Sequence, residues 1–506
     1  MTSPKANARL VITGAGGAVG HALVPMALEA GFDVIAVDLP GADIPCPDRV
    51  EVRSGDLRRR RFCKDAVAGG DLIIHAAAQG PGSALYEEMI GINVDAVRWL
   101  YQAASDAGAQ RFVMLSSADL YKPRRGVLLE DSQIEPGSAY TATKAEAERF
   151  LRSEPKDGLS WTILRPSLSY GPRCHAFNTG LLTVPPLLRM FFSYVPGLTG
   201  GARNNWVHVE DIASAALLVA THPEASGQIY NVADQTPLAY GEILVALIQA
   251  YGLQMGPTIP FPVSIVQALS PFIDSDMTFR FLSGFLSPMW KRVQERHKLT
   301  GPLEPNVYRA GLAYLQGDRV VVTDKLTALG WQPRWPDLRQ GMAQTVRWYQ
   351  QARWVPDYRA LPDEDILDEG IGLSYRERLD AQNGHLELTV TFPSLRRLAL
   401  DQDAILEGTI SLDGIATEAE LVGTLRVHKA RRDMVYEFAF TGDDGQAHRF
   451  EGVKHLTLLG LVSDFAHLRG TLVGSHGQKI ADLVWRMDPR EELASFVQGL
   501  KPSFGQ

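Results

Sequence analysis

Residues 9–20 read RLVITGAGGAVG, and this stretch decides the fold of the first part of the chain. The segment RLVIT is typical of a buried β-strand, and an amphipathic helix is expected from the end of the glycine run to Ala30. In the turn between them, Gly14 permits a tight bend, Gly17 lets the backbone approach a phosphate, and Gly20 lets the helix pack on the strand. The pattern predicts an anion-binding turn at a helix N-terminus, formed by Gly14, Gly16, Gly17, Ala18, Val19 and Gly20.

A carboxylate follows the second predicted strand, which spans residues 33–37. Asp38 lies about twenty residues after the glycines, where an acidic side chain accepts hydrogen bonds from the ribose hydroxyls of adenosine and repels a 2′-phosphate. No Arg or Lys follows it closely, so NAD is predicted as the cofactor in preference to NADP. An isolated Asp before Pro40 would be an ordinary turn residue, but the spacing from Gly14 favours the ribose contact.

Strands and helices continue to alternate after Asp38. Strands are expected at residues 50–53, 71–76, 111–115 and 160–164, and helices near residues 84–107 and 139–151. Alternating β and α elements predict an α/β fold with a Rossmann-type, doubly wound parallel sheet. In that architecture ligands bind at the carboxyl edge of the strands.

Two helical residues and a serine form the candidate catalytic set. Tyr140 and Lys144 are four residues apart, so both side chains project from the same face of the predicted helix. A cation beside a phenol stabilises the phenolate, and we expect Lys144 to lower the pKa of Tyr140 toward the working pH of a general acid/base. Ser117 directly follows the strand at 111–115, where its hydroxyl can bond a substrate oxygen. A Tyr–Lys pair alone is common on solvated helices, but its combination with Ser117 and the glycine turn favours catalysis.

These motifs have the order found in the extended short-chain dehydrogenase/reductase superfamily, which the chain resembles from Ala8 to Gln350. The resemblance implies an NAD-dependent enzyme in which Tyr140 is the acid/base, Lys144 holds the nicotinamide ribose and Ser117 positions the substrate oxygen. It also implies that Asn93 belongs to the catalytic set as a residue that supports the active site, and that no metal is required. The residues implied to make further contacts with the cofactor are Asp56, Leu57, Ala76, Ala77, Ala78 and Pro166. The resemblance is carried by TGAGGAVG at 13–20, Asp38, GDL at 55–57, HAAA at 75–78, Asn93-Val94, SSADLY at 116–121, YTATK at 140–144, LRPSLSYGP at 164–172 and VHVEDIA at 207–213.

The segment around Leu168 bears on the substrate. In relatives that act on nucleotide sugars, an Asn occupies this position and contacts the sugar or its phosphate, whereas this chain has Leu. LRPSLSYGP and NNWVHVEDIA resemble the branch of the superfamily that contains 3β-hydroxysteroid dehydrogenases, and residues 257–280 are rich in Pro, Phe, Ile and Leu. Both features imply a small hydrophobic substrate, steroid- or lipid-like, that is bound mainly by residues 170–205 and 235–345 and contacted by Ser117 and Leu168.

Two other functions are compatible with the same residues. A nucleotide-sugar epimerase or dehydratase would use the same Tyr, Lys and Ser but return the hydride to the substrate. A non-catalytic regulator that binds NAD or a lipid would keep the nucleotide fold without chemistry, and the intact catalytic set argues against it. The sequence leaves open the direction of the reaction and the oligomeric state, for which a homodimer is common in this superfamily.

We assign residues 1–350 to the NAD-binding and substrate domain. The periodicity of strands and helices stops after residue 350. Residues 351–372 accumulate acids and are predicted to be a linker. In residues 373–506, alternating apolar and polar positions predict strands at 385–392, 405–412, 421–427, 434–440 and 448–453, so an all-β antiparallel barrel or sandwich is expected. Its SYRERL at 374–379, residues 433–456 and DFAHLRGTL at 464–472 resemble a module attached to cholesterol-oxidase-like flavoproteins, which implies a lipocalin-like barrel.

Composition argues against several partners and environments. The net charge of -8 has no compensating basic block beyond residues 58–61, which argues against nucleic acid. Three cysteines without metal-ligand spacing argue against a disulfide framework or a metal site. No secretion signal precedes the first strand, so a cytoplasmic location is expected. The apolar stretch at 181–198 is broken by prolines and Arg189 and cannot span a bilayer, but peripheral membrane contact stays open.

Overall fold

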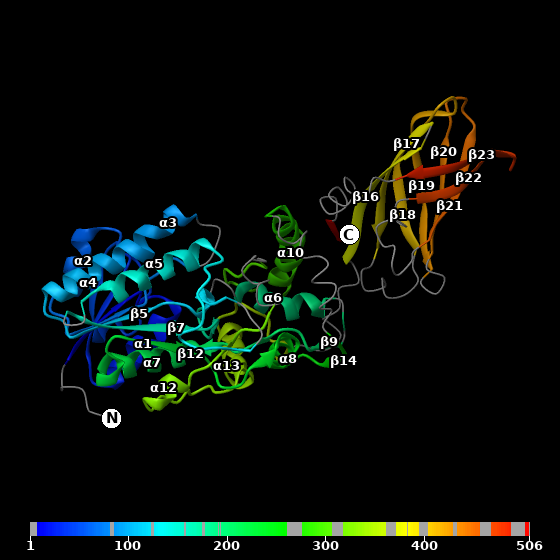
Figure 1. Cartoon of the computed structure of the whole chain (residues 1–506). Helices are drawn as coiled ribbons and strands as arrows, with labels where there is room; N and C mark the ends of the chain where they lie inside the picture. Colours follow the sequence, from blue (N-terminus) through cyan, green and yellow to red (C-terminus); the bar gives the residue numbers. More distant parts are fainter. Residues whose placement is uncertain are drawn as a thin grey trace. The chain divides into compact units, whose positions relative to one another are not determined.

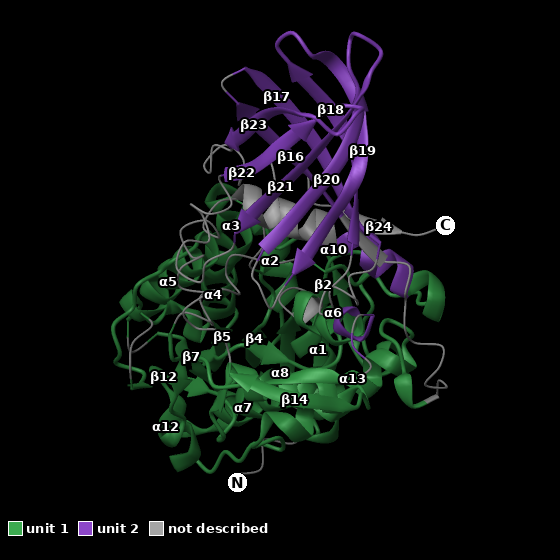
Figure 2. Ribbon diagram, turned by 90° about the vertical axis from the view of Figure 1, so that its right-hand side faces the viewer, with its two compact units in different colours: residues 1–186, 194–274, 294–361 green, residues 187–193, 275–293, 362–506 purple. Residues whose placement is uncertain are grey.

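The structure is a computed structural model that describes residues 8–80, 85–122, 126–155, 158–174, 178–190, 192, 194–260, 276–305, 317–360, 371–381, 383–393, 403–428, 433–455, 467–486 and 501–504. The chain forms two compact units, coloured green and purple in Figure 2. The first comprises residues 1–186, 194–274 and 294–361, and the second comprises residues 187–193, 275–293 and 362–506. The first unit thus ends within the segment predicted as a linker, residues 351–372, whose bounds stay a prediction.

A parallel sheet forms the centre of the first unit (Figure 1). Within the described residues it has seven strands in the order β3-β2-β1-β4-β5-β7-β12, so the direction of winding reverses between β1 and β4. This order confirms the predicted Rossmann-type fold, in which a cofactor binds at the reversal. The strands are β1 (Arg9–Thr13), β2 (Asp33–Asp38), β3 (Glu51–Ser54), β4 (Leu72–His75), β5 (Arg111–Leu115), β7 (Ser160–Pro166) and β12 (Gln228–Val232).

Helices cover both faces of this sheet (Figure 1). Along β1, Leu10 and Ile12 pack in one core with α1 and α7, whereas Val11 packs in the opposite core with α2, α4 and α5. All three side chains are fully buried, and burying each contributes about 1.5–3 kcal/mol. Packing on both faces fixes the strands, and with them the loops at their carboxyl ends. The covering helices are α1 (Ala18–Glu29), α2 (Arg60–Val67), α4 (Ala96–Asp106), α5 (Ala139–Ser153) and α7 (Val209–Thr221).

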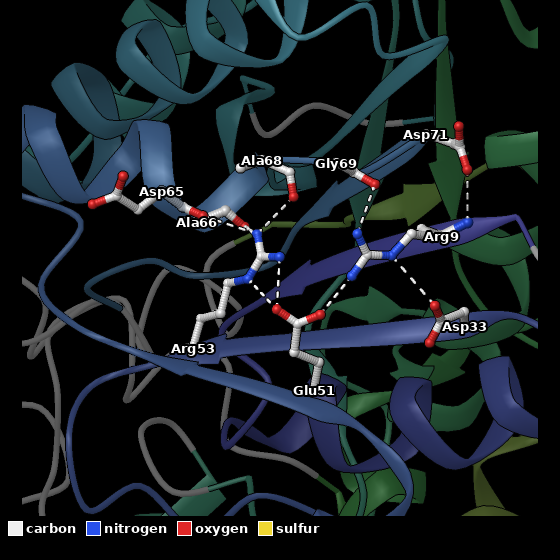
Figure 3. Close-up of polar contacts among 9 residues, drawn as sticks. All are labelled: Arg9, Asp33, Glu51, Arg53, Asp65, Ala66, Ala68, Gly69 and Asp71. Carbon is white, nitrogen blue, oxygen red and sulfur yellow. Dashed lines mark hydrogen bonds and ion pairs between the residues drawn. The ribbon is translucent and has the colours of Figure 1, made fainter.

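An ion-pair network ties the amino ends of β1, β2 and β3 to helix α2 (Figure 3). Glu51 on β3 accepts hydrogen bonds from Arg9 at 2.5 Å and from Arg53 at 2.7 Å. The Arg53 guanidinium also donates to backbone carbonyls at the C-terminal end of α2, where the negative end of the helix dipole lies. Arg9 pairs with Asp33 at 3.3 Å, and its backbone N–H donates to Asp71 at 2.8 Å. The network therefore holds β1, β2, β3 and α2 together at the edge of the sheet opposite the edge where ligands bind.

The helix predicted near residues 84–107 contains a π-helical turn in the structure. It consists of α3 (Tyr86–Ile90), a π-helical turn η2 (Gly91–Asp95) and α4, and residues 81–84 lie outside the described residues. A π-helical turn adds a residue to the helical ladder and rotates the side chains that follow. The predicted long helix is confirmed, but its π-helical turn was not predicted, because apolar periodicity does not reveal the extra residue. The turn contains Asn93, a predicted active-site residue.

Paired short strands and further helices make up the rest of the described chain before the barrel. Two of the pairs join residues 195–204 to residues beyond 237, so the two segments predicted to bind substrate are paired with each other. The pairs are β6 (Val127–Leu128) with β15 (Val320–Val321), β8 (Ser169–Tyr170) with β11 (Val207–His208), β9 (Val195–Thr199) with β14 (Met255–Pro260), and β10 (Arg203–Asn204) with β13 (Leu238–Ala239). The helices are α6 (Asn178–Arg189), α8 (Tyr240–Ala250), α10 (Asp276–His297), α12 (Asp324–Ala328), α13 (Leu338–Gln351), and the short η1 (Pro47–Arg49), η3 (Ala118–Leu120), η4 (Pro223–Ala225) and η5 (Tyr358–Ala360). None of the helices in the described ranges has the length and apolar character needed to cross a bilayer.

The second unit contains a closed antiparallel β-barrel (Figure 2). In the described part of the chain, eight strands follow the order β17 to β23 and then β16, which closes the barrel by pairing with β17. Strand β24 extends the sheet by pairing with β16 at residues 371–374. A barrel, not a sandwich, therefore forms. The strands of the whole sheet, β24 included, are β16 (Ile371–Ala381), β17 (Gly384–Phe392), β18 (Asp403–Leu412), β19 (Ala416–His428), β20 (Asp433–Thr441), β21 (Ala447–His455), β22 (His467–Val473), β23 (Lys479–Arg486) and β24 (Lys501–Phe504).

The barrel has an apolar core that includes a buried ion pair. Leu406, Phe450 and many other buried side chains form the core. Among the buried polar residues, Lys454 Nζ lies 3.0 Å from Glu377 Oε2, and the Tyr436 hydroxyl donates to the same carboxylate at 3.1 Å. Because an unpaired charge is costly in such surroundings, each charged group depends on the other. The resemblance of this barrel to a flavoprotein module stays a prediction.

Candidate active site

The glycine turn follows β1 directly. Gly14 has a φ of 72°, and a Cβ at this position would lie 2.7 Å from the backbone nitrogen of Ala77. A Cβ at Gly20 would lie 2.3 Å from the Gly14 carbonyl oxygen, so neither position accepts a side chain unless the backbone moves. Helix α1 begins after Gly17, which has no side chain to cap it. Its first backbone N–H groups therefore suit an anion such as a pyrophosphate.

Asp38 ends β2 beside this turn. One carboxylate oxygen accepts the N–H of Gly16 at 2.8 Å, and the other accepts the N–H of Leu39 at 2.7 Å. An ionised carboxylate has further lone pairs, so Asp38 can also accept ribose hydroxyls. Asp56 follows β3 and binds the Arg58 guanidinium at 2.8 Å, and this hydrogen bond holds the pKa of Asp56 below its usual range.

Ser117, Tyr140 and Lys144 come together at the carboxyl edge of β5. Ser117 caps η3, since its Oγ accepts the backbone N–H of Asp119 at 3.1 Å. Tyr140 and Lys144 lie one turn apart on α5, and both line the same cavity as Ser117. The Lys144 Nζ lies 5.9 Å from the centre of the Tyr140 ring and donates to the carbonyl of Leu115, the last residue of β5, at 2.8 Å.

Burial dominates the pKa values of this pair. It raises the pKa of Tyr140, the carboxylate of Asp119 raises it further, and the hydrogen bond with Ser117 opposes the rise. The expectation that Lys144 lowers the pKa of Tyr140 was therefore wrong. Burial lowers the pKa of Lys144 to about 8, against the opposing charge of Glu148. Near neutral pH the phenol is thus protonated and the lysine is mostly charged.

A buried ion pair supports the catalytic set. Glu148, one turn beyond Lys144 on α5, accepts two hydrogen bonds from Arg165 at 2.9 and 2.5 Å. The same carboxylate accepts the Ser116 hydroxyl at 2.5 Å, so it joins α5 to β7 and to the loop that carries Ser117. Sequence reasoning missed Glu148, although its spacing of four residues from Lys144 places both side chains on one helix face.

Asn93 lies in the π-helical turn and links two loops of the site. Its side-chain nitrogen donates to the Gln79 carbonyl at 3.1 Å and to the Thr143 hydroxyl at 3.0 Å, and its oxygen accepts the Gln79 N–H at 2.9 Å. These bonds connect the segment after β4 to α5 between Tyr140 and Lys144. The geometry is that of a positioning residue.

A cavity of about 330 Å³ is shared by the glycine turn and the catalytic set. The predicted residues that line it are Gly14, Gly17, Ala18, Val19, Gly20, Ala76, Ala78, Ser117, Tyr140, Lys144, Pro166 and Leu168. Gly16, Asp38, Asp56, Leu57, Ala77 and Asn93 were also predicted, but they do not line this cavity. Sequence reasoning did not single out the other lining residues, which are Gly80, Leu115, Ser116, Asp119, Ser167, Ser169, Cys174 and Ile212.

Known proteins resemble the chain over the part that carries this site. Residues 10–233 match the model of the NAD dependent epimerase/dehydratase family. Over 266 residues the chain is 30% identical to the low-salt glycan biosynthesis protein Agl12 of Haloferax volcanii, a match that covers 48% of this chain and 82% of that protein. It is also 30% identical over 266 residues to a 3 beta-hydroxysteroid dehydrogenase/Delta 5→4-isomerase of Mycobacterium tuberculosis, with 48% and 70% covered. The chain belongs to the NAD dependent epimerase/dehydratase family.

NAD is the cofactor of this epimerase/dehydratase family member. The uncapped start of α1, the carboxylate of Asp38 and a cavity that reaches Tyr140 fit this dinucleotide. The solved structure of DesIV, a dTDP-glucose 4,6-dehydratase from Streptomyces venezuelae with NAD and TYD bound, has a similar fold. That similarity has a TM-score of 0.51 at 23% identity and covers 69% of this chain and 98% of the DesIV chain.

Proposed function

We propose that the chain is an NAD-dependent oxidoreductase that interconverts a secondary alcohol and a ketone on a hydrophobic, steroid- or lipid-like substrate. The observation that carries this proposal is the cavity in which Ser117, Tyr140 and Lys144 share a lining with the glycine turn. The glycine turn would hold the cofactor that carries the hydride, and Tyr140 would supply the proton, which are the two functions that alcohol–ketone interconversion needs.

In this proposal Tyr140 is the residue that transfers the proton. Because burial raises its pKa, the phenol stays protonated near neutral pH and can donate to the oxygen of a ketone. The Ser117 hydroxyl, which lines the same cavity, can hold the same oxygen. In alcohol oxidation the proton moves the other way, from the substrate hydroxyl to the Tyr140 oxygen. NAD, when bound, accepts or supplies the hydride.

Apolar lining residues support a hydrophobic substrate. Pro166, Leu168, Cys174 and Ile212 all contribute to the cavity. Apolar walls around a few placed polar groups are the usual composition of a pocket for such a ligand. The similarity to a hydroxysteroid dehydrogenase of Mycobacterium tuberculosis supports the same substrate class.

A nucleotide-sugar epimerase or dehydratase is the second candidate. The family description and the similarity to Agl12, a glycan biosynthesis protein, favour it. Such an enzyme would use the same Ser117, Tyr140 and Lys144 but return the hydride to its substrate, so NADH would not accumulate. Leu168 counts against this candidate, because its side chain offers no hydrogen bond to a sugar or phosphate.

One assay separates the two candidates. Purified protein is mixed with NAD+ and a panel of hydroxysteroids, long-chain 3-hydroxy acids and UDP-sugars, and with NADH and the matching ketones. NADH formation or consumption is followed by absorbance, and sugar epimers are followed by chromatography. Turnover of NADH with a steroid or lipid supports the oxidoreductase. Epimer formation with no net change in NADH would replace it with the second candidate.

A further inference from the structure

Helix α5 carries a carboxylate next to the catalytic lysine. Tyr140, Lys144 and Glu148 follow one another at intervals of four residues, so Lys144 is flanked along the helix by a phenol and a carboxylate. Lys144 and Glu148 are both buried. Solvent screens a buried pair of charges only weakly, so the charge of Glu148 acts strongly on the ammonium. Hydride transfer by itself gives Glu148 no role.

The Glu148 carboxylate is held in a fixed position. Arg165 on β7 donates two hydrogen bonds to it, at 2.9 and 2.5 Å, and the Ser116 hydroxyl donates a third at 2.5 Å. Ser116 follows β5, so the carboxylate is bound from two neighbouring strands as well as carried by α5. Glu148 is therefore an anion that two buried cations share, Arg165 and Lys144.

One of these two cations can lose its proton and the other cannot. A guanidinium stays charged in proteins, whereas a buried ammonium readily becomes neutral. Burial lowers the pKa of Lys144 to about 8, and the charge of Glu148 opposes this shift. Without the carboxylate the site would hold two buried cations and no anion, which is costly. Lys144 is the cation that would then give up its charge.

The other titratable groups near Lys144 do not replace this carboxylate. Tyr140 is neutral near neutral pH, because burial raises its pKa. His75, at the end of β4, is neutral as well, since burial and then the charge of Lys144 lower its pKa to about 3. Asp119 on η3 acts on Tyr140 and forms an ion pair with an arginine guanidinium at 3.5 Å. Among the described residues, Glu148 is thus the anion whose charge acts on Lys144.

The charge of Lys144 matters when the proton is transferred. As a ketone takes the hydride of NADH, its oxygen takes the Tyr140 proton, and a phenolate is left beside the ammonium. A positive neighbour stabilises that phenolate, and a neutral amine would not. We propose that Glu148 is a positioning residue that keeps Lys144 protonated during the reaction and so sets the highest pH at which the enzyme works. This proposal rests on the proposed oxidoreductase function.

The pH dependence of ketone reduction tests this role. The full chain is given saturating NADH and the ketone of the panel that it reduces fastest, and kcat/KM is measured from about pH 6 to about pH 10. Glu148→Gln removes the charge and keeps an oxygen that can accept from Arg165 and Ser116. Glu146→Gln makes the same chemical change two residues away on α5, where the carboxylate binds Arg98 at 2.8 Å. The affinity for NADH, measured by fluorescence titration over the same pH range, is a second readout that needs no ketone.

We expect kcat/KM of the wild type to fall above about pH 8, where Lys144 loses its proton. Glu148→Gln should move this fall to lower pH by about one unit or more, which is a loss of about tenfold at pH 9 and a much smaller loss at pH 6. Glu146→Gln should keep the wild-type profile. The affinity for NADH should weaken over the same pH ranges, because a charged ammonium attracts the anionic cofactor.

Several outcomes would contradict the role of Glu148. An equal loss of kcat/KM at every pH would overturn it, since Glu148 would then only support the fold, and so would a wild-type profile that stays flat up to about pH 10. If no ketone is reduced, the expected shift in NADH affinity would refute the oxidoreductase and leave the role of Glu148 standing, and an unshifted affinity would refute both. If Glu148→Gln does not fold, Arg165→Gln decides. It frees the carboxylate from its other cation, so the fall should move to higher pH, and an unmoved fall would overturn the proposal.

Discussion

Lys144 Nζ donates a hydrogen bond of 2.8 Å to the carbonyl of Leu115 and so joins α5 to the end of β5. The ammonium is buried, and burial lowers the pKa of Lys144 to about 8. In an unfolded chain the pKa of a lysine is about 10.4. Between these values the unfolded state binds more protons, so the contribution of Lys144 to stability rises as the pH increases from about 8 to about 10.5.

Lys144→Met should remove this pH dependence. At pH 7 the wild type carries the full cost of a buried charge, and by about pH 10.5 that cost is gone. The difference in free energy of unfolding, variant minus wild type, is therefore expected to fall by about 3 kcal/mol between these pH values. Urea unfolding at both pH values measures it. Lys64→Met, at an exposed position of α2, should keep a constant difference. A constant difference for Lys144→Met would contradict the lowered pKa.

Tyr140→Phe should abolish most turnover and retain cofactor binding. The substitution removes one hydroxyl from the cavity lining and keeps the ring, so kcat is expected to fall by about 10²- to 10⁴-fold. Stopped-flow absorbance gives the rate, and fluorescence titration with NADH gives the affinity. Tyr101→Phe removes a hydroxyl that donates to the Leu159 carbonyl, away from the cavity lining, and should leave turnover near normal. Near-normal turnover in Tyr140→Phe would refute the acid/base role.

Asp38→Asn should weaken the preference for NAD over NADP. The change removes a negative charge at the end of β2, where it would repel a 2′-phosphate, and keeps an oxygen that can accept the Gly16 N–H. We expect the ratio of kcat/KM values, NAD over NADP, to fall by about tenfold or more, which corresponds to about 1.4 kcal/mol. Asp65→Asn makes the same chemical change at an exposed position of α2 and is the matched control. A wild type that prefers NADP would show that the Asp38 carboxylate does not bind the ribose hydroxyls of adenosine.

Lys454→Met should destabilise the barrel more than the loss of both charges does. The single change leaves the buried Glu377 carboxylate without its cation, which costs about 3–5 kcal/mol. Glu377→Leu combined with Lys454→Met removes both charges and is expected to come close to the wild type. Calorimetry of the full chain measures both. A double variant as unstable as the single one would show that the pair is not the source of the loss.

Local patterns predicted the elements that carry the cofactor turn. Strand β1 was predicted at residues 9–13, its bounds in the structure, because a buried strand and a glycine turn have short-range signatures. The spacing of Tyr140 and Lys144 likewise predicted their shared helix face. The direction of the Tyr140 pKa shift could not be predicted, because it depends on burial by residues far apart in sequence. The Glu377–Lys454 pair, 77 residues apart, depends on the strand order of the barrel and has no local signature.

Barrel closure also has a consequence for how the chain is made. Strand β16 is synthesised early in the barrel, yet it pairs on one side with β23 and β24, which leave the ribosome last among the barrel strands. Until then β16 presents one row of free backbone donors and acceptors, which is a template for pairing with another nascent chain. Chains that terminate before residue 479 would keep that edge exposed. We therefore expect such fragments to aggregate during synthesis, even where the first unit is complete.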